Sequence, residues 1–463
     1  MERKNAWAAY AEDDSRVEAF AKAYCDFINN GKTERECVAY GEKLAKSHGF
    51  EDLNAVIRSG RKLEAGARVY VNWMGKSFML FVLGAKPLEE GTNILGAHID
   101  SPRIDVKQNP LYEDGDLAYL DTHYYGGIKK YQWVAMPLAL HGVIIKKNGE
   151  KVPVNIGEDE NDPVFCISDL LIHLAQEQMA KNAKDVVEGE ALNLIVGGRP
   201  LAGEEKDAVK ANVLKLLDDK YGVEEEDFLS AELEIVPAGK ARDMGFDRSM
   251  ILGYGHDDRV CAYPSMMAVL DYEGTPDYTL CCIITDKEEI GSVGATGMAS
   301  HYLENTVAEL YACTADYCEL AVRRCLRNSR MLSSDVSAGY DPNFASAFEK
   351  KNSAFLGRGI CFNKFTGSRG KSGSNDANPE FMASLRKIMD DAGVAFQTAE
   401  LGRVDLGGGG TIAYLCAKYG MNVIDSGIAV LSMHAPYEII SKVDLYEGYR
   451  CYCAFLKGAK PVD

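Results

Sequence analysis

The chain is organised around one continuous segment, Tyr278-Thr279-Leu280-Cys281-Cys282-Ile283-Ile284-Thr285 followed by Asp286-Lys287-Glu288-Glu289-Ile290-Gly291-Ser292. Its first half is an apolar, β-branched run of the kind that forms a fully buried strand. Two adjacent glutamates then follow the strand end, where open α/β sheets bind their ligands. Because like charges repel, a bound cation would divide their roles, one glutamate as ligand and the other as a proton-transfer group. A solvated loop with two ordinary acids is the alternative.

Composition describes a globular protein with a strongly negative charge. The 463 residues favour two domains, and 46% hydrophobic residues supply ample material for a core. The 51 basic and 69 acidic residues give a net charge of −18. Nucleic acids and anionic membranes both need clustered Lys and Arg, so we expect neither as a partner.

Cysteine usage and hydropathy bear on the compartment. The 13 cysteines lie mostly within apolar runs and form no CxxC pair, as is typical of small buried residues in a reducing environment. Residues 1–7 lack the apolar core and cleavage site of a signal peptide. No run approaches the ~20 apolar residues of a membrane span. We therefore expect a soluble, cytoplasmic protein.

Hydrophobic periodicity predicts alternating helices and strands. Helices are predicted within residues 1–60, with a capping box at 33–36, and at 165–181, 208–221, 260–270, 293–302, 379–391 and 444–457, with shorter ones around 323–327 and up to 419. Strands are predicted at 68–73, 77–83, 93–99, 135–145, 278–285, 310–315 and 422–431. Between about 110 and 243 the pattern becomes β-rich, which indicates an inserted domain. Its strands show no second covering layer of their own, so we expect another subunit to cover them.

Four further motifs place polar side chains beside these elements. The apolar run 93–99 leads into His98-x-Asp100, a spacing that suits a metal-ligating histidine supported by a carboxylate, with a core or surface histidine as the alternative. Asp257 precedes the buried helix 260–270, where compensation of the helix dipole explains it equally well. Asp335 follows a short apolar run. His434 lies three residues after the end of the last predicted strand, 422–431.

Five potential ligands thus stand in chain order: His98, Asp257, Glu289, Asp335 and His434. Imidazole and carboxylate ligands without thiolates suit Zn²⁺, Co²⁺ or Mn²⁺ rather than a structural cysteine-type zinc site. Five ligands are too many for one tetrahedral zinc. They fit two metals, about 3.5–4 Å apart, if one carboxylate bridges them, and such a pair would orient a shared water.

The motif series resembles the M18 family of metalloaminopeptidases, which includes aspartyl aminopeptidase, and the related M42 and M20/M28 co-catalytic zinc peptidases. The motifs are HxDSPR, HDDR, DKEEIGS, SSDVS and SMHAPYE, spread in this order from residue 98 to 438. The resemblance implies an α/β catalytic domain with a mixed sheet flanked by helices, made of residues 1–105 and 246–463. It also implies an inserted β-rich dimerisation domain, residues 106–245, and a homo-oligomer, typically a tetrahedral dodecamer built from dimers.

The resemblance also assigns roles, residue by residue. His98 is similar to the first metal ligand, with Asp100 as its supporting carboxylate, and Asp257 to the bridging ligand, followed in relatives by a cis peptide bond. Glu289 and Asp335 resemble one terminal carboxylate for each metal, and His434 the remaining imidazole. Glu288 matches the general base. A base must reach the attacking water without being a ligand, so that it can pass a proton to the leaving amine.

Substrate selection is where the sequence departs from the family pattern. The stretch 337–341 lacks the histidines of eukaryotic aspartyl aminopeptidases, and 125–129 lacks the Gly-Gly-Gly-aromatic run that is usual in the family. Strict preference for acidic residues is therefore in doubt. Candidate substrate contacts are His173, on the predicted helix 165–181 and similar to a position that reaches a neighbouring subunit's active site, and Lys364, Lys371 and Gly410. A helix-face histidine, a solvated basic loop and tight glycine packing are the alternatives.

We therefore predict an aminopeptidase (hydrolase class 3.4.11) that releases N-terminal residues from peptides. Two divalent ions, zinc before cobalt or manganese, would activate water with Glu288 as general base. A related di-metal amidohydrolase of the aminoacylase or dipeptidase type is the alternative. A catalytically inactive scaffold would require loss of a ligand or of the base, and this chain retains all six.

Overall fold

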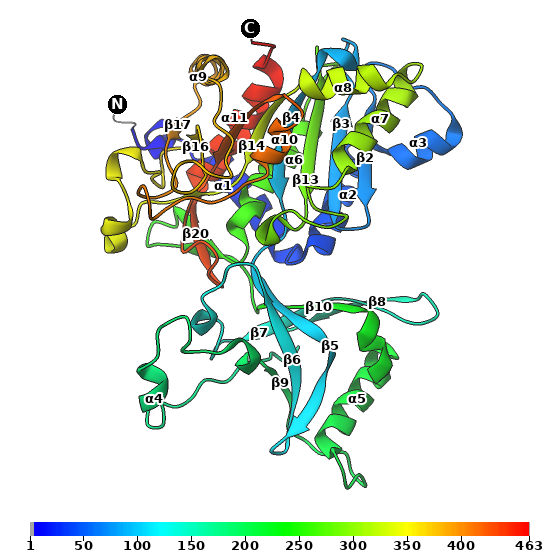
Figure 1. Ribbon diagram of the computed structural model, residues 1–463, viewed down its shortest axis with the longest axis vertical. Coiled ribbons are helices and arrows are strands. Elements are labelled where there is room, and N and C mark those ends of the chain that lie inside the picture. The colour runs from blue at the N-terminus through cyan, green and yellow to red at the C-terminus, as the bar shows by residue number, and fades with distance from the viewer. Residues whose placement is uncertain (1–3, 463) are drawn as a thin grey trace. The chain divides into compact units, whose positions relative to one another are not determined.

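The structure, a computed structural model, describes residues 4–462. Residues 1–3, part of the segment inspected for a signal peptide, lie outside the described residues. The chain divides into two compact units (Figure 1). The first contains Met1–Asp100, Arg242–Met433 and Glu438–Asp463, and the second contains Ser101–Ala241 and His434–Tyr437. The expected domains, 1–105 with 246–463 and 106–245, remain a prediction.

The first unit is built on a nine-stranded mixed sheet with the strand order β1-β2-β3-β13-β4-β14-β18-β16-β17. Its middle strands run parallel: β13 (Thr279–Thr285), β4 (Thr92–His98), β14 (Arg330–Ser334) and β18 (Asn422–Gly427). Every residue of β13 is buried, as its apolar sequence predicts. The outer strands are β1 (Glu51–Asp52), β2 (Arg68–Trp73), β3 (Ser77–Val82), β16 (Ile360–Asn363) and β17 (Phe396–Thr398).

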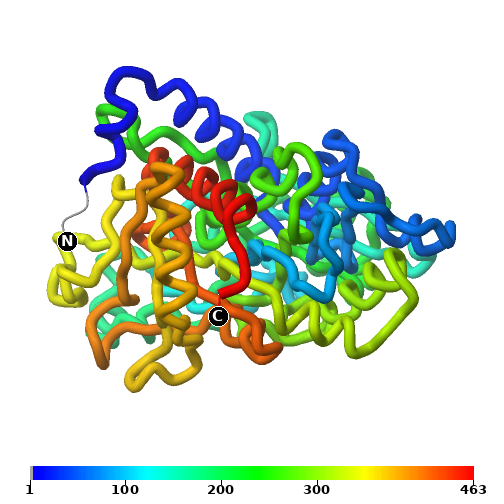
Figure 2. Tube along the Cα trace, turned by 90° about the horizontal axis from the view of Figure 1, so that it is seen from above, coloured from blue at the N-terminus to red at the C-terminus, as the bar shows by residue number. Residues whose placement is uncertain are grey.

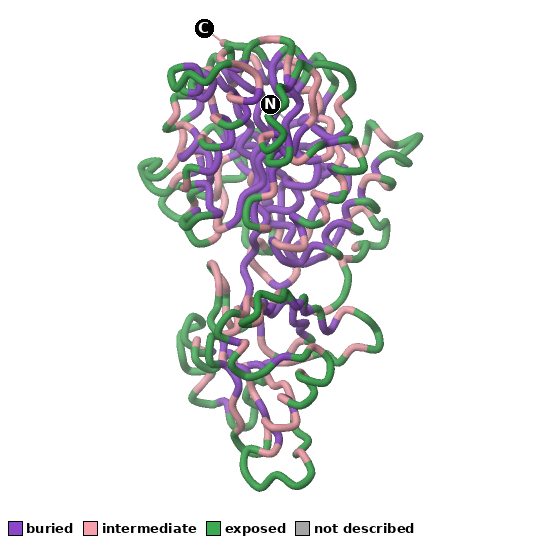
Figure 3. Tube along the Cα trace, turned by 90° about the vertical axis from the view of Figure 1, so that its right-hand side faces the viewer, coloured by how far each residue is buried: buried purple, intermediate pink, exposed green. Residues whose placement is uncertain are grey.

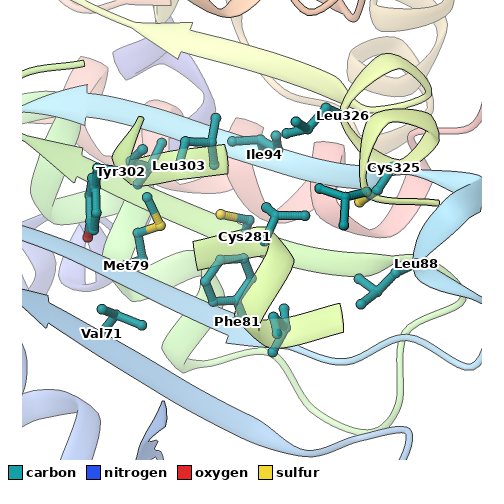
Figure 4. Packing of buried hydrophobic residues seen from close by; sticks show 14 of the residues in the cluster. Val71, Met79, Phe81, Leu88, Ile94, Cys281, Tyr302, Leu303, Cys325 and Leu326 are labelled. Atoms are coloured by element: carbon teal, nitrogen blue, oxygen red, sulfur yellow. The ribbon is translucent and has the colours of Figure 1, made fainter. Parts of the chain in front are cut away.

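Helices cover both faces of this sheet. One face packs against α3 (Leu53–Ser59), α7 (Tyr302–Thr314), α8 (Glu319–Arg327) and α10 (Ala413–Ala417). Figure 4 shows the resulting core, in which Phe81 and Cys281 of the strands lie among Leu303 and Leu326 of the helices. Truncating a fully buried ring such as Phe81 to alanine would cost about 3–5 kcal/mol.

The opposite face packs against α6 (His256–Leu270) and α11 (Lys442–Gly458). Around these two lie α1 (Ser15–Asn30), α2 (Glu34–Ser47) and α9 (Pro379–Ala392). The predicted capping box at Thr33 and Glu36 opens α2. Figure 2 shows α1 (blue) beside α11 (red), where Lys442 Nζ donates to Glu18 Oε2 at 2.7 Å. None of the described helices is long and apolar enough to cross a membrane.

A smaller five-stranded sheet completes the first unit, in the order β11-β12-β20-β19-β15. Its strands are β11 (Arg242–Met244), β12 (Met250–Gly253), β20 (Glu438–Ser441), β19 (Ala429–Leu431) and β15 (Ser337–Ala338). β20 leads into α11 and β12 precedes α6. Because β12 and β20 are paired, this sheet holds the starts of both buried helices next to each other.

The second unit contains a six-stranded antiparallel sheet in the order β8-β7-β10-β5-β6-β9. The strands are β5 (Arg103–Asp114), β6 (Leu117–Tyr125), β7 (Leu138–Ile145), β8 (Lys151–Ile156), β9 (Leu194–Gly197) and β10 (Ala231–Pro237). The helix α5 (Ala208–Tyr221) packs on β5, β6 and β9. The expectation that this sheet has no covering layer of its own was therefore too strong. Figure 3 shows that much of this unit is exposed or only half-buried.

The predicted helix at 165–181 is wrong for most of its length. Only α4 (Gln176–Met179) forms, and His173 lies in an irregular, exposed segment before it. The apolar residues of this segment, Leu170, Leu171, Ile172 and Leu174, are 47–69% exposed. A short amphipathic sequence gains its helicity mainly from tertiary packing, and within this unit the segment has little to pack on.

Three other element predictions are wrong in instructive ways. The residues at 310–314 belong to α7 rather than to the strand predicted at 310–315, and Ala315 caps the helix. A short apolar run fits either structure. The predicted helix at 293–302 is a tight loop around Gly297, where a Cβ would lie 2.2 Å from the carbonyl oxygen of Ser292. The predicted strand 422–431 divides into β18 and β19, which belong to different sheets.

Candidate metal centre

Three neighbouring strands of the large sheet end beside the candidate ligands. His98 is the last residue of β4, Asp335 directly follows β14, and the two glutamates lie in a single 3-10 turn (Glu288–Ile290) that follows β13. Because these strands are parallel neighbours, their carboxyl ends meet at one edge of the sheet. The buried start of α6 brings Asp257 to the same edge.

His98 lies at the middle of the cluster and is buried. Its Nε2 is 3.3 Å from Asp257 Oδ1, 3.9 Å from Glu288 Oε2 and 4.0 Å from Asp335 Oδ1. Burial alone would lower the pKa of His98, but hydrogen bonds with Asp100 and Asp257 override it and raise that pKa well above its ordinary value. One imidazole is therefore surrounded by carboxylates.

Asp100 connects the histidine to the glutamate turn. Its Oδ1 lies 3.1 Å from His98 Nδ1 and accepts a hydrogen bond from the backbone N–H of Glu288 at 3.1 Å. Its Oδ2 accepts one from the backbone N–H of Glu289 at 3.0 Å. This single buried carboxylate therefore orients the imidazole, leaving Nε2 to face the other acids, and holds the turn that presents both glutamates.

The start of α6 is held by residues to which sequence analysis gave no role. The peptide bond between Asp257 and Asp258 is cis, as the resemblance predicted. The backbone N–H of Asp257 donates to Glu438 Oε2 at 2.9 Å, and Asp258 Oδ2 accepts weakly from the backbone N–H of His98 at 3.4 Å. Tyr24 and the buried His256 share a hydrogen bond of 2.7 Å. Glu438 stands in the same motif as His434, which was the one available signal for it.

Among residues 4–462, two groups of side chains have the spacing to hold a cation. His98, Asp257 and Glu289 form one, and His98, Asp258 and Asp335 form the other, with ligand atoms within 4.8 Å of one another in each group. Asp258 was not predicted as a ligand. Burial, followed by the charge of Glu288, raises the pKa of Asp335 well above its ordinary value, and burial likewise raises that of Asp258. Such a donor set fits a divalent cation, which would neutralise crowded carboxylates and displace their protons.

The structure does not group every predicted residue with this cluster. His434 belongs to the second unit, where its Nδ1 is hydrogen-bonded to the carbonyl oxygen of Gly127 at 3.0 Å. Lys364 and Lys371 both pair with Asp376, at 3.2 and 3.0 Å. Gly410 is exposed, with space for a Cβ, and His173 is exposed in the second unit. The roles of these five residues remain predictions.

Comparison with known proteins gives consistent matches along nearly the whole chain. The model of the family described as aminopeptidase I zinc metalloprotease (M18) matches residues 27–456. A probable M18 family aminopeptidase 1 of Clostridium acetobutylicum is 58% identical over 458 residues, 98% of both chains. The crystal structure of an M18 aminopeptidase from Thermotoga maritima superposes with a TM-score of 0.94, at 42% identity over 99% of this chain and 100% of that one. The S. cerevisiae mApe1 dodecamer has the same fold, with a TM-score of 0.76 at 21% identity over 96% and 97%.

Proposed function

Since this chain belongs to the M18 family of zinc metalloproteases and is a metalloaminopeptidase, we propose a mechanism for it. The enzyme releases N-terminal residues from peptides by using two divalent ions and a glutamate as general base. The observation that carries the proposal is the group of carboxylates around His98 Nε2, in which oxygens of Asp257 and Glu288 both lie within 4 Å of this nitrogen. The two ligand groups overlap at this histidine, whose Nε2 can bind one ion, and the carboxylates of the two groups, Asp257 with Glu289 and Asp258 with Asp335, supply enough anionic ligands for a second ion.

The protein residues divide the work of peptide hydrolysis. His98, Asp257, Glu289 and Asp335 would hold the ions, with His434 as the further imidazole and Asp258 as an additional carboxylate. When bound, two such ions polarise the scissile carbonyl and lower the pKa of the attacking water. Glu288 takes a proton from that water and passes it to the leaving amine. Asp100 fixes the position of this base through the backbone N–H of Glu288.

Metal identity and reaction class are tested together. We expect zinc, with cobalt or manganese as substitutes, since imidazole and carboxylate ligands suit all three. Metal analysis of the purified protein should give two ions per chain. An aminoacyl-amide and tripeptide panel should show release of N-terminal residues. Hydrolysis of N-acyl amino acids but not of tripeptides would instead support the aminoacylase or dipeptidase alternative.

We further propose that the protein assembles into a homo-oligomer, a dodecamer built from dimers, with residues 106–245 as the dimerisation domain. Support comes from the exposed apolar segment Leu170–Leu174, which has no cover within its own unit. Contiguous apolar surface of this kind marks association sites. The related mApe1 was solved as a dodecamer. Light scattering at micromolar concentration tests the assembly, and a monomer would rule it out.

A further inference from the structure

A buried arginine that forms no ion pair with a described residue lies at the end of the large sheet opposite the metal centre. Arg330 is the first residue of β14 and is 0% exposed. Asp335 follows the other end of the same strand, so the two residues are separated by about 15 Å of extended chain. Sequence analysis gave Arg330 no role.

The guanidinium of Arg330 is held in place but is not neutralised. Its Nε donates to Asn93 Oδ1 at 2.8 Å, and its Cζ lies 4.3 Å from the centre of the Tyr278 ring. Its Nη1 and Nη2 have no hydrogen-bond partner among residues 4–462, and it forms no ion pair there. Burial lowers its pKa to about 10, so it remains charged at neutral pH. A buried, unpaired cation is costly, which calls for an anion.

The surroundings supply a space for that anion. A cavity of about 330 Å³ is lined by Arg330, Arg327, Asn328, Ser329 and Asn422, with Glu90 among its walls. Arg327, at the end of α8, also forms no ion pair with a described carboxylate. Glu90 is ion-paired with Lys86 at 3.6 Å and with neither arginine, although its charge raises the pKa of Arg330. Two guanidinium groups and side-chain amides are the donors that recognise carboxylate or phosphate oxygens.

We propose that this cavity, at the amino ends of β14 and β18, binds a small oxyanion, a carboxylate or a phosphate, between Arg330 and Arg327. The site is distinct from the metal centre and does not depend on the proposed catalytic mechanism. Arg330 provides the fixed, buried charge, and Arg327 closes on the ligand from the exposed helix end. The volume admits a molecule larger than the bare ion, such as a dicarboxylate or a phosphate ester.

The test compares matched variants by calorimetric titration at constant ionic strength, with inorganic phosphate and succinate as probes. Arg327→Gln removes one proposed contact at an exposed position, and Arg330→Met removes the buried charge. Arg324→Gln takes the same charge from the same helix without touching the cavity, and serves as the control. Oxyanions also bind metal centres, but such binding would be equal in all variants. Only the part of the measured binding that differs between variants is therefore assigned to the cavity.

We expect saturable binding in the wild type and in Arg324→Gln, about tenfold weaker binding in Arg327→Gln, and none in Arg330→Met. If Arg330→Met does not fold, Arg327→Gln decides alone. Binding of one probe only would assign the ligand class, phosphate or carboxylate. Absence of saturable binding of both probes, or equal affinity in Arg327→Gln and wild type, would overturn the proposal.

Discussion

The adjacent glutamates differ in what surrounds them, and this difference separates their functions. Glu288 Oε2 lies 3.9 Å from His98 Nε2, whereas Glu289 belongs to a ligand group with His98 and Asp257. Glu288→Gln keeps the ligands and the shape of the turn but cannot accept a proton. We expect it to retain both metals and to lose turnover by at least ~10²–10⁴-fold.

Glu289→Gln should fail in another way, because it replaces an anionic ligand with a neutral one. We expect it to lose metal from one site and to regain part of its activity in excess metal. Bound metal and kcat measured on both variants decide the matter. Metal loss in Glu288→Gln alone would reverse the assignment, and full activity in both would remove this turn from the catalytic centre.

The basic residues of the 364–371 loop give a second prediction at this scale. Lys364 and Lys371 both pair with Asp376 in the structure. If they select substrates by charge, an acidic N-terminal side chain must compete with Asp376 for them. Lys364→Ala and Lys371→Ala should then lower kcat/KM for Asp and Glu substrates relative to Leu. An unchanged Asp, Glu and Leu profile would leave the loop without a role in selection.

Single residues also show what the sequence could predict of the site. His98, Asp100, Glu288 and Glu289 were placed at strand ends from hydrophobic patterning alone, and the structure brings them together. Asp258 and Glu438 were missed as parts of the cluster. Asp258 is the residue directly after the predicted ligand Asp257. A linear sequence does not indicate which of two adjacent aspartates points into the site. Glu438 reaches Asp257 only because β20 pairs with β12, a long-range pairing that local patterns do not encode.

At the scale of elements, α11 is fixed to the rest of its unit by a buried acid. Asp444 accepts hydrogen bonds from the backbone N–H groups of Gly357 and Gly359, both at 2.6 Å. Burial raises the pKa of Asp444 to about 8 from its ordinary value of 3.8, with a further rise from Glu447. The folded protein therefore holds a proton that the unfolded chain releases above pH 3.8.

This difference makes the stability of the unit depend on pH. The contribution of Asp444 to the free energy of unfolding is fully present below pH 3.8 and is lost progressively as the pH rises to about 8. Asp444→Asn resembles the protonated acid and lacks the titration. We expect the unfolding free energy of the wild type to fall relative to that of Asp444→Asn between pH 5 and pH 8. A constant gap in denaturant titrations across this range would show that Asp444 stays ionised.

Elements were predicted well where their own sequence carries a complete pattern. The amphipathic helices α5, α9 and α11 and the hairpin of β2 and β3 lie close to their predicted ranges. The segment 165–181 failed because its apolar residues have no surface within their own unit to pack on. Short apolar runs such as 310–315 failed because six residues do not distinguish a strand from a helix.

For the whole molecule, the exposed segment Leu170–Leu174 predicts how assembly can be broken. If a second copy covers Ile172, which is 69% exposed in the single chain, then Ile172→Lys should bury a charge in that interface. We expect a smaller assembly by light scattering with unchanged folding by circular dichroism. Leu229→Lys, at a 55% exposed position outside the segment, is the control. Equal masses for wild type and Ile172→Lys would exclude this segment from the interface.

The central strand order has a consequence for how the protein is made. Ile94 of β4 pairs with Cys281 of β13, although residues Ser101–Ala241 of the second unit are synthesised between them. The ribosome therefore releases β2, β3 and β4 long before their central neighbour exists, and the open edges of β3 and β4 are exposed for that time. Long-range parallel pairing is slow and exposes aggregation-prone edges. The nascent chain should stay sensitive to protease in its first hundred residues until β13 and β14 emerge, which makes this the interval in which a chaperone would matter most.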